Sequence, residues 1–561
     1  MGSELGITAE SQAAVNLSPV SIWWAVWAGV WTAAVAAGMV YLIINRDMPA
    51  LRIRGLALSL SSIVLLHLYW LACQFGTMVG ALMPGDGQYW IMGTYLPCGI
   101  ALFHASNSRF LHVAKLQRKY AQHGFRFTDA SPDEKPKTGL INRFRRLDYT
   151  TKILITVGAA MFAQIFLTIL MYIISRKWHS SWGIPGTEVH GSEMAQKTAQ
   201  GTGWEWWPGV FWQFFWSWVV APVILWKARN IHDTQGWRVQ TIGCAIGSLH
   251  ATPMWLIALY VPAMAPVNQY WIPPQWICLS ILIIEIFTVF LPCWEVVRHQ
   301  SLRQETLDSI ARWETKVKAS GSENKSINSD ATIVESIMSG WKSTNDSIKS
   351  SGSRDSILTM SALEHVLERN PTPLQEFSAL REFSGENIAF LTSVAEWKSS
   401  LPAALRDSTS PRSGSTKDLF REHFNRALHI YAEFISVRHA EFPVNISSHD
   451  LKKLEEVFER PARILYGEER EADPVSPFDK FTFEPASPTV SESSEKEMTN
   501  CIRNRVHYWG EIPEEFDANV FQDAEASIKY LVLTNTWPKF IKDRRTSITS
   551  FETLKPGMEV V

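Results

Sequence analysis

The stretch from Trp276 to Val297 reads WICLSILIIEIFTVFLPCWEVV and sets the interpretation of the first half of the chain. An α-helix rises about 1.5 Å per residue and the hydrocarbon core of a bilayer is about 30 Å thick, so this stretch is long and apolar enough to span a membrane. Six further apolar stretches of membrane-spanning length precede it, at 21–44, 56–82, 89–112, 153–175, 210–226 and 239–264. The sequence therefore predicts a bundle of seven transmembrane helices over residues 21–297.

The composition separates this region from the rest of the chain. Of the 25 tryptophans in 561 residues, 20 precede residue 295, and their amphipathic rings favour the two membrane–water interfaces. The net charge of −2 gives no reason to expect nucleic-acid binding. Five of the six cysteines lie in apolar stretches and Cys501 in a polar one, so no disulfide framework is visible. We expect no cofactor and no metal.

The basic residues of the loops predict the orientation. Loops one–two, three–four and five–six carry 16 Lys and Arg residues, whereas the opposite side carries only Arg176, Lys177 and Lys197. Because basic loops are retained in the cytoplasm, we expect an extracellular N-terminus over residues 1–20 and a cytoplasmic location for everything after residue 297. The prediction is thus a multi-pass protein of the plasma membrane, in contact with the lipid bilayer.

One carboxylate interrupts the seventh span. Glu285 follows four consecutive Ile and Leu residues, and an ionised carboxylate at that depth costs several kcal/mol unless it is paired, hydrated or protonated. His250 in the sixth span is predicted at a similar depth, and the other candidate partners are His67, His104, Gln74 and Gln164. Glu285 and His250 are therefore a candidate intramembrane ligand site. The alternative is a neutral carboxyl that holds helices together.

The remainder of the chain divides by composition. We expect a charged juxtamembrane helix followed by a Ser-rich linker over residues 298–357. A second, all-α helical domain is expected over 358–545, and a C-terminal tail over 546–561. Within the helical domain, apolar residues recur every three or four positions, as at Phe420, Phe424 and Leu428. A long acidic, Ser- and Pro-rich insertion at about 467–513 predicts disorder. The predicted fold class is all-α throughout.

Four segments of this second domain resemble the regulator of G-protein signalling (RGS) family. They are FSGENIAF at 383–390, IYAEFI at 430–435, PVNI at 443–446 and WPKF at 537–540, the last preceded by an apolar helix with Phe521, Ala524 and Leu531. Each segment by itself is a weak indication, but the four occur in the family's order on a helical background.

The resemblance implies that the domain accelerates GTP hydrolysis by a heterotrimeric G-protein α subunit. Such domains contribute no chemistry of their own and bind the switch segments of the α subunit in their transition-state arrangement. By resemblance, Asn445 would lie beside the glutamine that orients water, Glu386 and Asn387 would hydrogen-bond a switch loop, and Leu531 would make an apolar contact. Asn535 and Lys539 would also bind the α subunit. They stand where the family commonly has Asp and Arg, and Lys cannot make the planar bidentate contact that Arg makes.

Seven spans followed by such a domain resemble the fungal GprK-type class of hybrid receptor–RGS proteins. This resemblance implies a membrane-tethered regulator, in which an unknown extracellular ligand could act through the bundle. Two other readings are open: a ligand-activated G-protein-coupled receptor with nucleotide-exchange activity and a built-in RGS brake, and a transporter with a regulatory tail, for which Glu285 is the best indication.

Overall fold

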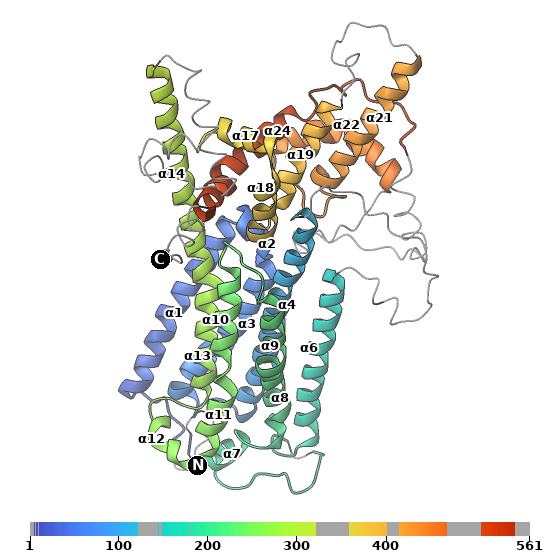
Figure 1. Cartoon of the computed structure of the whole chain (residues 1–561). Coiled ribbons are helices and arrows are strands. Elements are labelled where there is room, and N and C mark those ends of the chain that lie inside the picture. Colours follow the sequence, from blue (N-terminus) through green and yellow to red (C-terminus); the bar gives the residue numbers. More distant parts are fainter. Residues whose placement is uncertain are drawn as a thin grey trace, which may run out of the picture. The chain divides into compact units, whose positions relative to one another are not determined.

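The computed structural model describes residues 5, 7–8, 11–121, 144, 149–179, 181–320, 358–400, 414–467 and 507–544 (Figure 1). Within these ranges the secondary structure is helical, and β pairing is limited to one isolated bridge between Ser175 and Ile184. The expected all-α fold class is therefore confirmed for the described residues. The Ser-rich part of the linker (321–357), most of the acidic insertion (468–506) and the C-terminal tail lie outside them.

Six helical segments are long and apolar enough to cross a membrane. They run over Pro19–Ile44, Leu56–Val79, Thr151–Ile174, Trp204–Ala228, Trp237–Tyr260 and Pro274–Arg312. These correspond to six of the seven expected spans and indicate a multi-pass membrane protein. The third expected span, 89–112, lies in the long helix α4 (Gly85–Ala121), which contains Pro97 and does not belong to these six. A seventh crossing stays a prediction.

The chain divides into two compact units. Unit 1 comprises 1–113 and 140–296, together with 476–479, and unit 2 comprises 114–139, 297–475 and 480–561. The helices that lie wholly in unit 1 are α1 (Pro19–Ile44), α2 (Pro49–Arg54), α3 (Leu56–Val79), α6 (Tyr149–Ile174), α7 (Glu193–Gln200), η1 (Trp204–Trp206), α8 (Trp207–Phe215), η2 (Trp216–Val220), α9 (Ala221–Ala228), α10 (Trp237–Ser248), α11 (Ala251–Tyr260), η3 (Pro262–Met264), α12 (Ala265–Asn268), α13 (Pro274–Glu285) and η4 (Ile286–Phe290).

The core of unit 1 forms where α3 and α13 pack together. Ile63, Leu66 and Tyr69 of α3 are fully buried, and Ile277 and Ile281 of α13 are each 2% exposed. Helix α1 packs on α3, but its apolar residues are otherwise exposed, as are those of α6. Exposed apolar helices are unfavourable in water and expected in lipid, so the burial pattern agrees with a membrane bundle.

Small residues allow close approach of two helices in this bundle. A Cβ atom built on Gly243 of α10 would lie 2.5 Å from the ring of Phe287, and one on Gly247 would lie 2.5 Å from Cγ2 of Ile283. Real Cβ atoms do not approach so closely, so a larger residue at either position would require the side chain of Phe287 or Ile283 to shift. Packing through small residues is typical of transmembrane helices, because dispersion contacts replace the hydrophobic effect there.

Unit 2 takes in the last turns of α4, from Ala114, and most of α14 (Leu291–Ser320). Its other helices are α17 (Met360–Arg369), α18 (Thr372–Phe377), η5 (Ser378–Glu382), α19 (Gly385–Ser399), α21 (Gly414–Ile430), η6 (Tyr431–Ile435), α22 (Ser448–Tyr466), α24 (Gln522–Leu531) and η7 (Val532–Thr536). Four phenylalanines from different segments are fully buried in its core: Phe390, Phe424, Phe458 and Phe521. Their edge and stacked contacts join α19, α21 and α22 to the start of α24.

Candidate functional site

The segment 383–390 forms a tight turn and the first turns of α19. Phe383 has φ +52°, an uncommon conformation for a bulky residue, and its ring is 1% exposed. The side chain of Ser378 donates to the carbonyl of Ser384 at 2.8 Å, and Gln375 Nε2 donates to the carbonyl of Gly385 at 3.1 Å. These bonds fix the backbone that delivers Glu386 and Asn387.

The end of α4, within unit 2, covers this turn. Gln117 Nε2 donates to Glu386 Oε2 at 2.9 Å, and Gln117 Oε1 accepts from the backbone N–H of Gly385 at 3.0 Å. The amide of Gln375 also donates to the carbonyl of Tyr120 at 2.5 Å. Glu386 is therefore 9% and Asn387 7% exposed. Sequence reasoning expected Glu386 to be available to a partner protein, whereas here a side chain of the same unit occupies it.

The last RGS-like segment, 537–540, packs against residues that precede the first, 383–390. Lys539 Nζ is 2.7 Å from Glu382 Oε2 and 3.3 Å from His299 Nε2. The ring of Phe540 packs against that of Phe377 at 5.5 Å between centroids, and α24 packs on α19. The structure thus brings segment 537–540 against residues just before segment 383–390, although the two segments are about 150 residues apart in sequence.

The other expected contact residues differ in accessibility. Leu531 at the end of α24 and Asn535 in η7 are half-buried. Asn445 is exposed, and its carboxamide makes no hydrogen bond within the described residues. Its loop is anchored on both sides, because the N–H of Val444 donates to the carbonyl of Phe434 at 2.8 Å and Ser447 caps α22. An anchored loop with a free carboxamide is suited to contacting a second protein.

Glu285 lies at the centre of a separate polar network in unit 1. Its side chain is fully buried, accepts a hydrogen bond from Trp31 Nε1 at 2.5 Å and lies 2.7 Å from His67 Nδ1. His67 Nε2 is 3.0 Å from the hydroxyl of Thr32, which itself donates to the carbonyl of Ala28 at 2.7 Å. The hydroxyl must therefore accept from His67, and one further proton lies between His67 Nδ1 and Glu285.

The candidate pair of Glu285 and His250 is not brought together. The hydrogen-bond partners of Glu285 are Trp31 and His67, and Nε2 of His250 has no partner in the described part of the chain. Each carboxylate oxygen of Glu285 has one hydrogen-bond partner on another helix, an arrangement that suits the alternative interpretation, in which a carboxyl group holds helices together.

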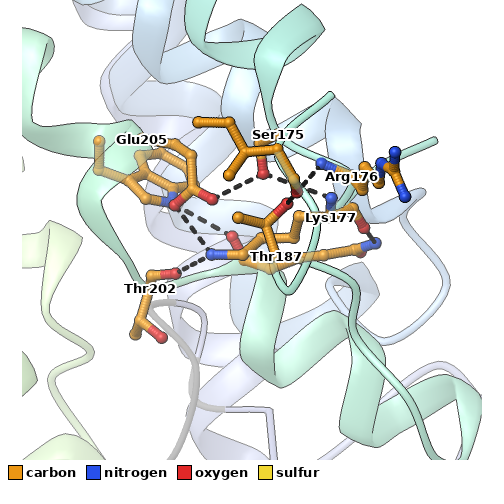
Figure 2. Close-up of polar contacts among 9 residues, drawn as sticks. Ser175, Arg176, Lys177, Thr187, Thr202 and Glu205 are labelled. Atoms are coloured by element: carbon orange, nitrogen blue, oxygen red, sulfur yellow. Dashed lines mark hydrogen bonds and ion pairs between the residues drawn. The ribbon is translucent and has the colours of Figure 1, made fainter. Parts of the chain in front are cut away.

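A second buried carboxylate was missed by the sequence reasoning. Figure 2 shows Glu205 between Ser175 and Lys177, where Ser175 Oγ donates at 2.7 Å and Lys177 Nζ lies at 2.9 Å. Lys177 Nζ also donates to the carbonyl of Thr202 at 2.7 Å. The side chain of Glu205 is fully buried, and this cluster ties the segment after α6 to η1. The sequence did contain a signal for this buried carboxylate, because Glu205 is a lone acidic residue among Trp204, Trp206 and Trp207.

Comparisons with known proteins were negative at all three levels. No protein-family model, no curated protein and no solved structure matches this chain.

Proposed function

We propose that this chain is a membrane-tethered regulator of heterotrimeric G-protein signalling, whose unit 2 accelerates GTP hydrolysis by an α subunit. The observation that carries the proposal is the ion pair of Lys539, in the last RGS-like segment, with Glu382, which directly precedes the first, together with an exposed Asn445 in an anchored loop. A carboxamide is suited to the assigned task, because it offers a donor and an acceptor without a charge.

The proposed mechanism is differential binding. An α subunit supplies its own catalytic arginine, so unit 2 would act by holding the switch segments in their transition-state arrangement. Asn445 would contact the water-orienting glutamine, and Asn387, Leu531, Asn535 and Lys539 would contribute to the same surface. On this proposal Gln117 competes with the α subunit for Glu386, so the contact at the end of α4 restrains activity.

The membrane location is part of the proposal. We place the N-terminus outside the plasma membrane and unit 2 in the cytoplasm, supported by the 16 basic residues of the loops on that side. Tethering would concentrate unit 2 at the leaflet where lipidated α subunits reside.

The test uses the full-length protein in lipid nanodiscs and a purified α subunit. We expect tighter binding to the α subunit with GDP and aluminium fluoride, which imitates the transition state, than with GDP alone. Asn445→Ala should lower the acceleration of single-turnover GTP hydrolysis by about tenfold or more. Its unfolding midpoint should not change, because the side chain is exposed and unbonded.

The matched control is Asn519→Ala, which also removes an exposed carboxamide but lies outside the four segments that resemble the RGS family. It should leave the hydrolysis rate unchanged. Equal binding in both nucleotide states would refute the proposal. The rate of GDP release from the α subunit, measured in the same samples, distinguishes the proposed regulator from an exchange receptor. An exchange receptor would accelerate GDP release, whereas the proposed regulator would not.

A further inference from the structure

Two arginines of unit 2 converge on one carboxylate. Arg463 Nε donates to Glu459 Oε1 at 3.0 Å, and Arg438 Nε lies 3.2 Å from the same oxygen. The other oxygen of Glu459 accepts a hydrogen bond from the hydroxyl of Tyr431 at 2.8 Å. Because both Nε atoms contact one oxygen, the two guanidinium groups are immediate neighbours.

The carboxylate balances only one of these two positive charges. Partial burial acts to raise the pKa of Glu459, but the hydrogen bonds from Tyr431 and Arg463 and the charges of Arg463 and Arg438 outweigh it and hold the pKa below its usual value. Glu459 is therefore ionised at neutral pH. Glu455, whose charge acts on Tyr431, forms no ion pair with either arginine. The arginine pair thus keeps one uncompensated positive charge.

Most of the hydrogen-bonding capacity of the two arginines is unused. A guanidinium group donates through Nε and through both Nη atoms. Neither Arg438 nor Arg463 makes a hydrogen bond through its Nη atoms within the described residues. The two side chains are 47% and 39% exposed, so these donors are open to solvent. Such a planar fork binds a phosphate group through two parallel hydrogen bonds.

The backbone holds both arginines in place before any ligand binds. Arg438 lies in a turn after η6, where its N–H donates to Ser436 Oγ at 3.3 Å and the N–H of Ala440 donates to the carbonyl of Ser436 at 2.9 Å. Arg463 lies in the last turns of α22, and its carbonyl accepts from the N–H of Gly467 at 2.9 Å. Preorganisation of this kind favours binding, because little ordering remains to be done.

Two exposed aliphatic side chains border the arginines. Val437, which precedes Arg438, is 55% exposed, and Ile464, which follows Arg463, is 65% exposed. A phosphate-binding fork beside aliphatic side chains suits a phosphorylated residue with apolar neighbours. A membrane surface is a poorer match, because recognition of anionic lipids takes clusters of about four to eight basic residues.

We propose that Arg438 and Arg463 bind the phosphate of a phosphoserine or phosphothreonine in a partner protein, whose flanking apolar residues contact Val437 and Ile464. Glu459 is a positioning residue, which orients both guanidinium groups through their Nε atoms. The assignment does not depend on the proposed GTPase-activating function, since none of these residues is assigned there to the α subunit.

The test titrates fluorescent peptides against the full-length protein in nanodiscs of neutral phosphatidylcholine and measures fluorescence anisotropy. Three peptides have the form Leu-Ala-X-Ala-Leu, where X is phosphoserine, serine or glutamate, and the fourth is the phosphoserine peptide with Ala in place of each Leu. We expect the first to bind about tenfold or more tightly than the serine and glutamate peptides. It should bind about threefold more tightly than the fourth, because the Leu side chains add apolar contacts.

Equal binding of the serine or glutamate peptide would overturn the proposal, and equal binding of the fourth would overturn the role of the aliphatic side chains. Inorganic phosphate and a short-chain phosphatidylinositol 4-phosphate are added as competitors. Displacement of the phosphoserine peptide by an equal concentration of the first would assign the site to a free anion. Displacement by the second would assign it to a lipid headgroup, and either result would also overturn the proposal.

Two variants locate the site. Arg438→Gln and Arg463→Gln should each lower the affinity for the phosphoserine peptide about tenfold. Their unfolding midpoints should stay close to the parent's, because Glu459 keeps Tyr431 and the other arginine. The matched control is Lys452→Gln, which makes the same charge change at an exposed position about three turns before Arg463 in α22. Unchanged affinity in either arginine variant, or an equal loss in the control, would refute the assignment.

Discussion

Removing His67 from the Glu285 network should destabilise unit 1 strongly. In His67→Leu the fully buried carboxylate of Glu285 keeps only the hydrogen bond from Trp31 Nε1, at 2.5 Å. The lost contact at 2.7 Å is charge-assisted and contributes about 1.5–3 kcal/mol, and the unpaired carboxyl group adds a desolvation cost. Breaking a buried pair from one side costs about 3–5 kcal/mol in soluble proteins. We expect a loss of about 3 kcal/mol, or a fall of roughly 6–12 °C in the unfolding midpoint.

The assay is a double-mutant cycle read through buried thiols. Cys73, Cys244 and Cys278 are at most 5% exposed, so a thiol-reactive fluorophore reports the opening of unit 1 on heating. Cys501, outside the described residues, is replaced by serine in every sample. Glu285→Leu should cost a similar amount to His67→Leu. The double variant should lose less than the sum of the two, because removing both partners leaves no buried charge and only the N–H of Trp31 loses its acceptor. Additive losses in the double variant would show that the two residues act independently and would refute this reasoning.

Three further predictions concern other features. If unit 2 activates GTP hydrolysis, Gln117→Ala should raise its activity by roughly three- to tenfold through release of Glu386; an unchanged or lower rate contradicts the competition. Gly55→Ala should lower the unfolding midpoint of unit 1, at a cost of about 1–2 kcal/mol, because φ is +66° and the new Cβ would lie 2.9 Å from Arg109 Nη1; a midpoint equal to the parent's would show that the site adapts. Burial lowers the pKa of His423, which is 5% exposed, below the unfolded value of about 6.5. The unfolded state then binds more protons than the folded state, so unit 2 should lose stability as pH falls below about 7. Unfolding midpoints measured at pH 5, 6 and 7 should therefore fall with pH, and they should fall less steeply in His423→Gln.

The periodic and compositional features of the fold could be predicted from sequence. Six membrane-length helices were located because length and hydropathy are local properties. The third expected span is helical but polar, since α4 includes His104, Ser106 and Asn107 before it enters unit 2. The helix at 89–112 was therefore predicted correctly, and its crossing of the membrane stays a prediction.

The polar networks could be predicted only in part. Glu285 was recognised as requiring a partner, and His67 was among the candidates, but the choice depends on the rotation and depth of two helices 218 residues apart. The pairing of Lys177 with Glu205 depends in the same way on how the segment after α6 folds back. Gln117 gave no signal at all, because a glutamine in a polar helix is unremarkable until its neighbour is known.

The shared proton between His67 and Glu285 has an electrical consequence. Whichever atom holds it, imidazole and carboxyl together carry no net charge, so a transmembrane voltage exerts no net force on the pair. Transfer of the proton across their 2.7 Å contact would displace charge over only about a tenth of the hydrocarbon thickness. At about 2.3 kcal/mol per elementary charge per 100 mV, a 100 mV change in the voltage across a membrane would bias that transfer by at most about 0.2 kcal/mol, well below thermal energy.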